Sequence, residues 1–535
     1  MIAPIIAFES SHSARYRDGC CWLALAAILL LATALRWPNF FESFWLDELH
    51  TAWAIGDQLR DVAPRAMQGN QPPLPYWLLW GWVQVVGVSE WSLRGPALVA
   101  SLSAIVSVAW VLWRWTPSRG AVLVAALALA LEPLAIFHGG EARVYAWLEL
   151  LAIWQVYWLQ RTCEQPTRSS RWMLVLLSLG LVHLHYTAAL LLIAEALFLV
   201  GGKLFNRSLA YSCRSAAIDG LLVLLGLLPL LPGLAVVAAR RANWSLFIEQ
   251  PSLSDLWSEL PLNLVLLTTA ALLLVVVIWR WRKEQSPLLS WPATGTIGIT
   301  LTALGGPLLL AWTLTELDVA RLFFARYLVV TIPAAALLLG LLIAAAPTAR
   351  WRWVALLLSS VVLLSSSHVL GDRLFFHEQP AGRSEDWRGV VAAINRPEWN
   401  HMPAIVLAPG LIEGDALRSS DNRELVEFCS YPLRAAYRLD RDLPILPLPA
   451  TDPGELTPGE RRFATEHGTA WLVIRGDANY RDGLVAGLRN SLGPALRVRD
   501  LTSEIVEKPP ARLPATPPGV HLLLIEYNPA GKAFK

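Results

Sequence analysis

The feature that most constrains the fold of this chain is a succession of long apolar runs separated by short polar loops. A membrane-spanning helix needs roughly 20 mostly apolar residues. Such runs lie near 21–37, 96–113, 120–137, 145–160, 172–185, 186–202, 216–237, 261–279, 290–314, 323–346 and 353–370. We therefore predict a polytopic α-helical membrane protein with about eleven spans. The first run is expected to be retained, because Arg36-Trp37-Pro38 follows it and offers no signal-peptide cleavage site.

Charge divides the chain into two parts. Only 16% of the 535 residues are charged, but residues 372–535 carry 20 Lys and Arg and 22 Asp and Glu. We predict a transmembrane domain over 1–371, whose first outer loop (38–95) holds interfacial helices, and a soluble domain over 372–535. The apolar composition excludes a disordered chain and disfavours an ordinary soluble enzyme. The net charge of +2 argues against a nucleic-acid partner.

The segment 372–535 is predicted to be a mixed α/β domain. Strand patterns lie at 404–408, 470–475 and 521–527, and helix patterns lie at 387–394, 421–428 and 481–491. The segment contains no glycine-rich phosphate loop and no nucleophile elbow. It is therefore interpreted as a binding or cover domain.

Basic residues set the expected orientation. If the short run 76–88 lies in the membrane interface, 15 of the 24 Lys and Arg before position 372 fall in the inner loops. A span at 76–88 would move the later basic loops outside, against the positive-inside rule. We therefore expect an inner N-terminus and an outer C-terminal domain.

The first outer loop contains Asp47 and Glu48, directly after an aromatic, apolar stretch. An apolar setting can raise the pKa of a carboxyl group and suit it to general-base catalysis. Alternatively, one of the two carboxylates caps an interfacial helix that starts near Leu49. The sequence leaves both interpretations open.

Further polar residues fall on the same outer face. Glu141 and Arg143 stand at the head of a span, where a cation is disfavoured by the helix dipole, so an anionic partner would explain Arg143. Arg326 opens a later span and either snorkels to headgroups or binds a phosphate. His185 and Tyr186 lie between two short spans. Trp244 follows Arg240-Arg241, for which the same two interpretations as for Arg326 hold.

These stretches resemble the GT-C glycosyltransferases that use polyprenyl-phosphate sugars, and in particular the bacterial relatives of the protein O-mannosyltransferases and of the lipid A aminoarabinose transferase. The resemblance covers most of residues 21–346. It rests on Trp45-Leu46-Asp47-Glu48, Gln71-Pro72-Pro73-Leu74, Glu90 with Arg94 and Pro96, Glu141-Ala142-Arg143-Val144-Tyr145, His185-Tyr186-Thr187, Arg326-Tyr327 and Pro333, with Glu385-Asp386-Trp387-Arg388 as a minor addition. It implies a GT-C-like catalytic membrane domain in a bacterial plasma membrane.

The resemblance also implies roles. Asp47 would be the catalytic base, Glu48 would assist it, and Glu141 would lie near the acceptor or a metal. Arg326, Arg143 and Tyr327 would hold the lipid phosphate. The substrate pocket would include Gln71, Tyr145, His185, Tyr186 and Trp244. The reaction would invert the anomeric centre of a hexose or pentose.

One position departs from the family pattern. Relatives often have His or Lys before the Pro-Pro pair, and this chain has the neutral Gln71. The phosphate charge is then expected to fall on Arg143 and Arg326. A divalent cation held by Glu141 and Asp47 is left open, as are the sugar and the acceptor, which could be a protein, a lipid or a glycan.

Two other functions remain as alternatives. A transporter or flippase for a lipid-linked or anionic substrate would also be polytopic, although transporters usually carry charges and broken helices near the bilayer midplane. An envelope scaffold with a degenerate active site is the third interpretation.

Overall fold

The structure is a computed structural model that describes residues 3–204, 209–242, 248–283, 294–367, 385–419, 422–505 and 519–528, with the side chains of 3–18, 294, 504 and 505 left out. By its contacts the chain divides into two compact units. The first, the helical unit, comprises Met1–Phe40, Asn70–Pro75 and Arg94–Gly371. The second, the sheet unit, comprises Phe41–Gly69, Tyr76–Leu93 and Asp372–Lys535.

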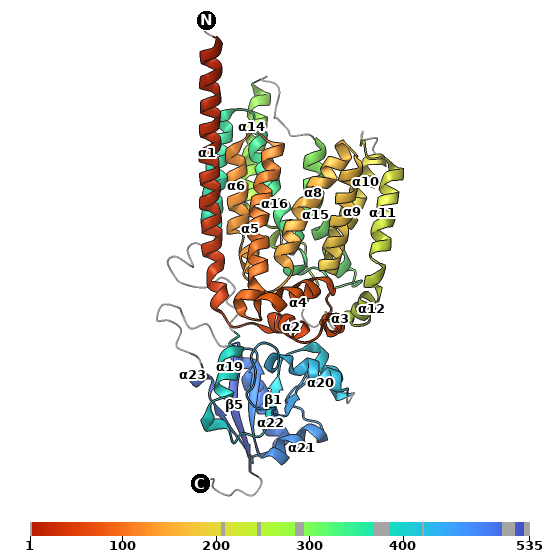
Figure 1. Ribbon diagram of the computed structural model, residues 1–535, viewed down its shortest axis with the longest axis vertical. Helices are drawn as coiled ribbons and strands as arrows, with labels where there is room; N and C mark the ends of the chain where they lie inside the picture. Colours follow the sequence, from red (N-terminus) through yellow and green to blue (C-terminus); the bar gives the residue numbers. More distant parts are fainter. Residues whose placement is uncertain are drawn as a thin grey trace. The chain divides into compact units, whose positions relative to one another are not determined.

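The helical unit is a bundle (Figure 1). Its helices are α1 (Ala3–Arg36), α5 (Glu90–Trp115, whose first turn belongs to the sheet unit), α6 (Arg119–Leu131), α7 (Pro133–Gly139), α8 (Tyr145–Glu164), α9 (Arg168–Leu184), α10 (Ala189–Leu204), α11 (Cys213–Gly226), α12 (Leu231–Ala239), α13 (Asp255–Ser258), α14 (Asn263–Arg282), α15 (Thr294–Glu316), α16 (Ile332–Ala345) and α17 (Ala349–Ser366). Short 3-10 turns connect several of them, at Trp37–Phe41, Tyr186–Ala188, Leu228–Leu230, Ala325–Tyr327 and Val329–Thr331.

The core of this bundle lies around α16 and α6. Nearly every residue of α16 is buried, which is expected of a helix that is apolar on all sides. Small residues allow close packing there. A Cβ on Gly340 of α16 would lie 2.5 Å from Leu112 of α5, so these two helices approach at a residue without a side chain.

Six helical stretches among the described residues are long and apolar enough to cross a membrane, namely Gly19–Phe41, Glu90–Trp115, Tyr186–Leu204, Cys213–Ala239, Asn263–Arg282 and Gly295–Glu316. The pair α6 and α7 would be a seventh, bent by 65°. Pro133 at the start of α7 explains the bend, since proline cannot continue the hydrogen-bond ladder of α6. The polytopic helical class is confirmed, whereas the count of eleven stays a prediction.

One predicted span has a different form in the structure. The run 323–346 was expected to be helical from its start, but the helix begins only at Ile332. Extended residues and two 3-10 turns precede it, so Arg326 lies in a turn rather than in the first helical turn of a span.

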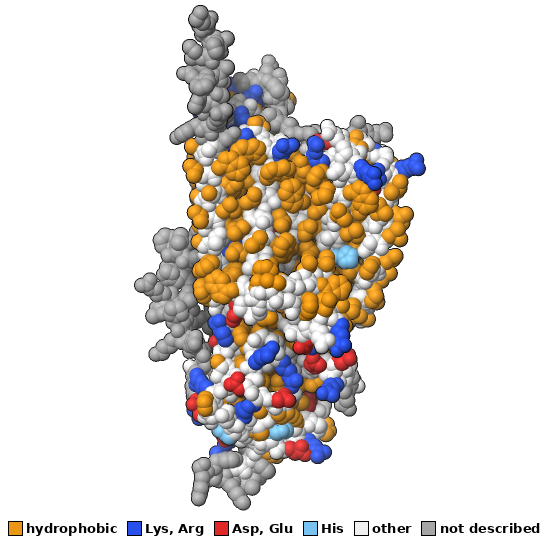
Figure 2. Space-filling model, viewed as in Figure 1, with side chains coloured by type: hydrophobic (Ala, Val, Ile, Leu, Met, Phe, Trp, Pro, Cys, Tyr) orange, Lys and Arg blue, Asp and Glu red, His pale blue; other side chains and the backbone are white. Residues whose placement is uncertain are grey.

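The space-filling view supports a membrane location for the helical unit. Apolar side chains cover its visible flank, and Lys and Arg side chains gather at the end where α1 begins (Figure 2). Basic residues that close or open helices include Arg114, Arg119, Arg161, Lys203 and Arg282. This distribution is typical of a multi-pass protein that obeys the positive-inside rule.

The first outer loop contains three short helices, α2 (Leu46–Ala54), α3 (Leu59–Gln68) and α4 (Leu74–Val86). With 13 residues, α4 is about 20 Å long, which is less than the ~30 Å hydrocarbon core. Its length favours the interfacial interpretation. The predicted membrane domain over 1–371 includes this loop, and its bounds stay a prediction; by their contacts Phe41–Gly69 and Tyr76–Leu93 group with the sheet unit.

The sheet unit has five strands in the order β2-β1-β3-β5-β4. They are β1 (Ile405–Ala408), β2 (Ile445–Pro447), β3 (Thr469–Arg475), β4 (Leu496–Asp500) and β5 (Val520–Tyr527). The strands β2, β1 and β3 are parallel, and β5 and β4 continue the sheet antiparallel. The predicted mixed α/β class is confirmed, together with three of the five strands.

Helices cover both faces of this sheet. The helices of the C-terminal segment are α19 (Trp387–Ile394), α20 (Arg423–Ser430), α21 (Pro458–His467), α22 (Ala478–Leu492) and α23 (Thr502–Ile505). Leu484 and Leu488 of α22 pack on one face, and Trp399 packs against Trp471 on the other. The five central residues of β3 are therefore buried, as in sheets covered on both sides.

Candidate active site

A turn between α7 and α8 holds the acidic residue Glu141 in the helical unit. Its side chain is fully buried, and its Oε2 lies 2.9 Å from Nδ1 of His138. In the described part of the chain its Oε1 has no hydrogen-bond partner. A buried carboxylate oxygen without a partner is costly unless a ligand or water satisfies it. Glu141 is therefore a candidate for contact with a substrate.

Two glycines fix the path of this turn. A Cβ on Gly139 would lie 2.6 Å from Nε of Arg36, and a Cβ on Gly140 would lie 2.6 Å from Nδ2 of Asn39. Arg36 is fully buried and donates from Nε to Oγ of Ser101 at 2.9 Å. The absence of side chains at both glycines thus lets the end of α1 approach the turn that carries Glu141.

Aromatic rings connect the turn to two distant segments. The ring centroids of His138 and Tyr145 are 4.5 Å apart, those of Tyr145 and His185 are 5.6 Å apart, and those of His185 and Tyr327 are 5.7 Å apart. These residues come from α7, α8, the junction of α9 and α10, and the turn before α16. The structure therefore brings together residues of three motifs singled out from the sequence, which contain Tyr145, His185 and Tyr327.

Two guanidinium groups act on the centre of this cluster. Arg143 and Arg326 both interact electrostatically with His185. His185 is buried, its Nδ1 lies 2.8 Å from Oγ1 of Thr187, and its Nε2 has no hydrogen-bond partner among the described residues. Arg326 also lies over the ring of Phe324, 5.0 Å from the centroid. Two planar, permanently charged groups at one site suit the binding of a phosphate.

The neutral Gln71 has a cation nearby. It is half-buried and follows Asn70, which adopts a φ of 60° and accepts a hydrogen bond from Nη1 of Arg240 at 3.3 Å. Tyr186 lies in the 3-10 turn before α10, and its buried hydroxyl has no partner in the described ranges. Trp244 lies outside the described residues.

Asp47 and Glu48 occupy the first turn of α2, in the sheet unit. Glu48 is fully buried, and its Oε2 accepts a hydrogen bond from the backbone N–H of Trp45 at 3.4 Å. The helix-capping alternative therefore holds for Glu48, although the helix begins at Leu46 and not near Leu49. Asp47 is half-buried, so its carboxylate remains partly accessible.

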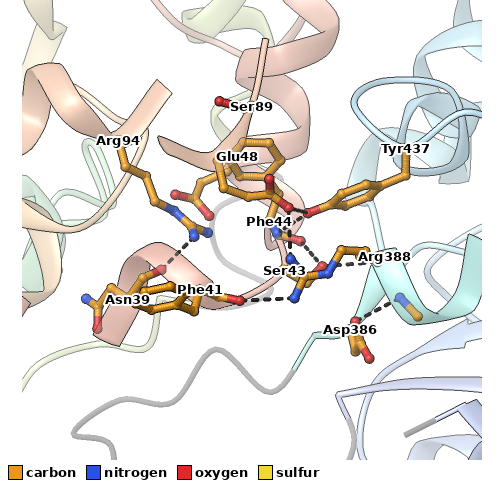
Figure 3. A network of polar contacts seen from close by, with 12 residues as sticks. Asn39, Phe41, Ser43, Phe44, Glu48, Ser89, Arg94, Asp386, Arg388 and Tyr437 are labelled. Carbon is orange, nitrogen blue, oxygen red and sulfur yellow. Dashed lines mark hydrogen bonds and ion pairs between the residues drawn. The ribbon is translucent and has the colours of Figure 1, made fainter. Parts of the chain in front are cut away.

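A second set of contacts orders the residues before α2 (Figure 3). The hydroxyl of Tyr437 accepts from the N–H of Phe44 at 2.8 Å and donates to Oε1 of Glu90 at 2.9 Å. Arg388 donates to the same Glu90 oxygen at 3.3 Å and to the carbonyl of Phe41 at 3.0 Å. Burial raises the pKa of Tyr437, which keeps its hydroxyl protonated at neutral pH.

The predicted site residues thus fall into two groups. Glu141, Arg143, Tyr145, His185, Arg326 and Tyr327 gather in the helical unit, which also contains Gln71 and Tyr186. Asp47 and Glu48 lie in the sheet unit, together with Glu385 and Arg388 from the minor acidic motif.

The described residues contain no group of three or more His, Cys, Asp or Glu side chains arranged to hold a metal ion. Glu141 and His138 provide one carboxylate and one imidazole, which falls short of the three or four protein ligands of a typical zinc site.

Three charges are buried in the helical unit, and two of them, Arg36 and Glu149, were not predicted as site residues from the sequence. Arg36 and Arg94 are fully buried, and Arg94 donates to the carbonyl of Asn39 at 2.6 Å (Figure 3). Glu149 of α8 is also fully buried, interacts electrostatically with Arg36, and has no hydrogen-bond partner for either oxygen in the parts that the structure describes. Each lies in or beside an apolar run, and an ionisable residue there is itself a signal of function.

Comparisons with known proteins give one family match and several similar solved structures. Residues 70–233 match the family model for dolichyl-phosphate-mannose-protein mannosyltransferases. The structure of ArnT from Cupriavidus metallidurans bound to undecaprenyl phosphate is similar, with 13% identity, a TM-score of 0.50, and 95% of this chain and 98% of that chain covered. AglB, an archaeal oligosaccharyltransferase from Archaeoglobus fulgidus in complex with an inhibitory peptide and a dolichol-phosphate, shares 11% identity with a TM-score of 0.47, and 86% and 70% of the two chains are covered. No curated protein sequence matches the chain.

Proposed function

Because this multi-pass membrane protein has the fold of the GT-C glycosyltransferases and carries the mannosyltransferase family match, we propose that it transfers a sugar from a polyprenyl-phosphate donor to an acceptor hydroxyl. One observation carries the proposal. The matched stretch contains the turn of Glu141 and Arg143 and also His185, where a partnerless carboxylate oxygen and guanidinium charge gather in a buried setting. An anionic lipid substrate fits such a setting.

On the donor side, Arg326, Arg143 and Tyr327 bind the lipid phosphate. The phosphate leaves with the electron pair of the broken bond to the sugar, and its growing negative charge is stabilised by the guanidinium groups. The sugar binds at Tyr145, His185, Tyr186 and Gln71 in this proposal. The structural relative ArnT was solved with undecaprenyl phosphate, a leaving group of this chemical class.

On the acceptor side, Asp47 takes the proton from the acceptor hydroxyl while the hydroxyl oxygen attacks the anomeric carbon. Direct displacement inverts the anomeric centre and forms no covalent sugar–enzyme intermediate. Glu48 supports this role through its capping bond, which fixes the first turn of α2. Glu141 contacts the acceptor or the sugar.

The reaction is placed on the outer face of the membrane. The inner loops hold most of the basic residues of the helical unit, and the acids of both groups belong to the outer loops of the predicted topology. In this arrangement the N-terminus is cytoplasmic and the C-terminal segment is extracytoplasmic, in a bacterial plasma membrane.

Substitution of Asp47 tests the role of the base. Asp47→Asn should abolish release of the lipid phosphate from a labelled polyprenyl-phosphate sugar, because an amide cannot accept the proton. The matched control is Asp61→Asn, an exposed carboxylate in the same loop that accepts from the N–H of Gln58. Unchanged transfer by Asp47→Asn would remove Asp47 as the base.

One observation favours the alternative of a transporter. The span formed by α6 and α7 is broken at Glu132, and broken helices mark the binding sites of many transporters. A flippase would move the lipid-linked sugar intact, so cleavage of the donor separates the two functions.

A further inference from the structure

Both backbone polar groups of the residue before Asp47 are held by side chains from the C-terminal segment. The N–H of Leu46 donates to Oε2 of Glu385 at 2.9 Å, and the carbonyl of Leu46 accepts from the hydroxyl of Tyr431 at 3.3 Å. Leu46 is the first residue of α2, so its N–H has no partner within the helix. Residues some 340 and 385 positions later in the chain thus fix the start of this helix.

Glu385 is itself held firmly. Its Oε2 also accepts from Nε1 of Trp387 at 2.8 Å, and its Oε1 accepts from Nε of Arg475 at 2.8 Å. Its side chain is 11% exposed and that of Arg475 is 29% exposed. A carboxylate with three donors has little freedom to move, so the N–H of Leu46 meets a fixed acceptor.

Charge connects the same residues to Asp47. Asp47 interacts electrostatically with Arg475 and with Tyr431. Burial raises the pKa of the Tyr431 hydroxyl, and the negative charge of Asp47 raises it further, so Tyr431 remains a donor at neutral pH. Glu385 and Glu413 also face Tyr431, and Arg475 is the cation that opposes these acids.

We propose that Glu385 and Arg475 are positioning residues for the base Asp47: Glu385 anchors the first turn of α2, and Arg475 stabilises the carboxylate form of Asp47. The C-terminal segment then takes part in catalysis, beyond the binding or cover role expected of it. This inference rests on the proposed function of Asp47. Neither residue contacts the reacting atoms in this account.

The charge part is tested with Arg475 variants, by measuring kcat for transfer across pH. Arg475→Gln should move the acidic limb of the profile to higher pH by about one unit, because a nearby cation favours an ionised carboxylate. Arg475→Lys keeps the positive charge, so its acidic limb should lie at the same pH as that of the wild type. The matched control is Arg481→Gln, which removes an arginine paired with Asp482 and Asp500 in the same unit.

The anchoring role of Glu385 is tested by changing, one at a time, the donor and the acceptor of the hydrogen bond between Leu46 and Glu385. Leu46→Pro removes the N–H donor and also replaces the buried Leu46 side chain, at a position where helices tolerate proline well (Leu46→Ala, which keeps the N–H, is the control for the lost side chain). Glu385→Gln removes the acceptor charge. Each should lower kcat roughly tenfold with little change in donor KM, since a misplaced base slows the chemical step. The double variant should be no slower than the worse single variant, because both changes break the same contact.

Thermal unfolding of each variant separates misfolding from mispositioning. Normal unfolding with a lowered kcat and a shifted acidic limb supports the proposal. A second outcome would contradict only the positioning roles. In that case Asp47→Asn abolishes transfer, but the folded variants Arg475→Gln, Leu46→Pro and Glu385→Gln keep the kcat and the pH profile of the wild type. Asp47 would then still be the base. If Asp47→Asn transfers the sugar at the wild-type rate, the proposed role of Asp47 as the base is wrong, and the positioning roles are wrong with it.

Discussion

At the scale of single residues, Gly139 leaves no room for a side chain. A Cβ there would lie 2.6 Å from Nε of Arg36 and 2.7 Å from Oγ of Ser101. Gly139→Ala should therefore lower the free energy of unfolding by about 1–3 kcal/mol and reduce transfer, because Arg36 must shift. The check is thermal unfolding in detergent beside the transfer assay. Gly220→Ala on α11, where a Cβ meets nothing within 4 Å, should be neutral, and equal losses in both variants would contradict the packing argument.

Arg326 is the residue on which we expect binding of the donor phosphate to depend most. Arg326→Ala should weaken binding of a polyprenyl-phosphate sugar by roughly tenfold or more, the value of a charge-assisted hydrogen bond. Isothermal titration measures it, with Arg321→Ala as the control, since Arg321 pairs with Asp318 three residues away. If donor affinity is unchanged and only acceptor use falls, Arg326 does not bind the phosphate.

Individual site residues could be predicted from the sequence only where a motif or a misplaced charge marked them. Glu141, Arg143 and Arg326 were singled out this way, and their roles stay predictions; in the structure Glu141 lies beside His138, and both arginines interact electrostatically with His185. The partner His138 was not singled out as a site residue, because nothing in the sequence tells which way its ring points. Glu149 was not predicted as a site residue, because a single carboxylate within a long apolar run does not by itself argue against a membrane span.

At the scale of elements, Tyr437 connects the segment before α2 to the C-terminal segment. Tyr437→Phe should raise hydrogen exchange at the Phe44 amide by about fivefold, since loss of one hydrogen bond costs about 1 kcal/mol. Hydrogen-exchange mass spectrometry of the peptide that spans Phe44 measures this change. The control is Tyr480→Phe, whose buried hydroxyl has no partner in the described ranges. Equal exchange in Tyr437→Phe and wild type would mean that the contact does not order this segment.

Elements were predictable where the pattern was long or strongly alternating. The helix predicted at 387–394 is α19 to the residue, and three strands were found within one or two residues. The strand β2 was missed because it has three residues and includes Pro447, which is acceptable only at a sheet edge. The other edge strand, β4, was missed because its charged residues mask the alternation.

At the scale of the whole molecule, the predicted topology depends on α4. Reporter fusions at Ser89 and Ser118 should report opposite sides of the membrane, with Ser89 outside, because α4 is too short to cross. An alkaline phosphatase and green fluorescent protein pair makes the assignment at each position. An inner location for Ser89 would mean that α4 spans and would invert every later loop.

The predicted domain bounds rest on the change in composition along the chain. The change in charge density near residue 372 coincides with a boundary between the two units. Composition could not assign the first outer loop, because its mixture of apolar and polar residues fits either unit. Its contacts with Glu385, Arg388, Tyr431 and Tyr437 depend on residues hundreds of positions away, and no local pattern encodes them.

The fate of the donor distinguishes a glycosyltransferase from a flippase most directly. Purified protein in liposomes is incubated with a panel of polyprenyl-phosphate sugars and hydroxyl acceptors, and the released lipid phosphate and the glycosylated acceptor are counted together. We expect one donor to yield both products in equal amounts, with an inverted anomeric centre, and Asp47→Asn to yield neither. Movement of the intact lipid-linked sugar across the bilayer without cleavage would contradict it.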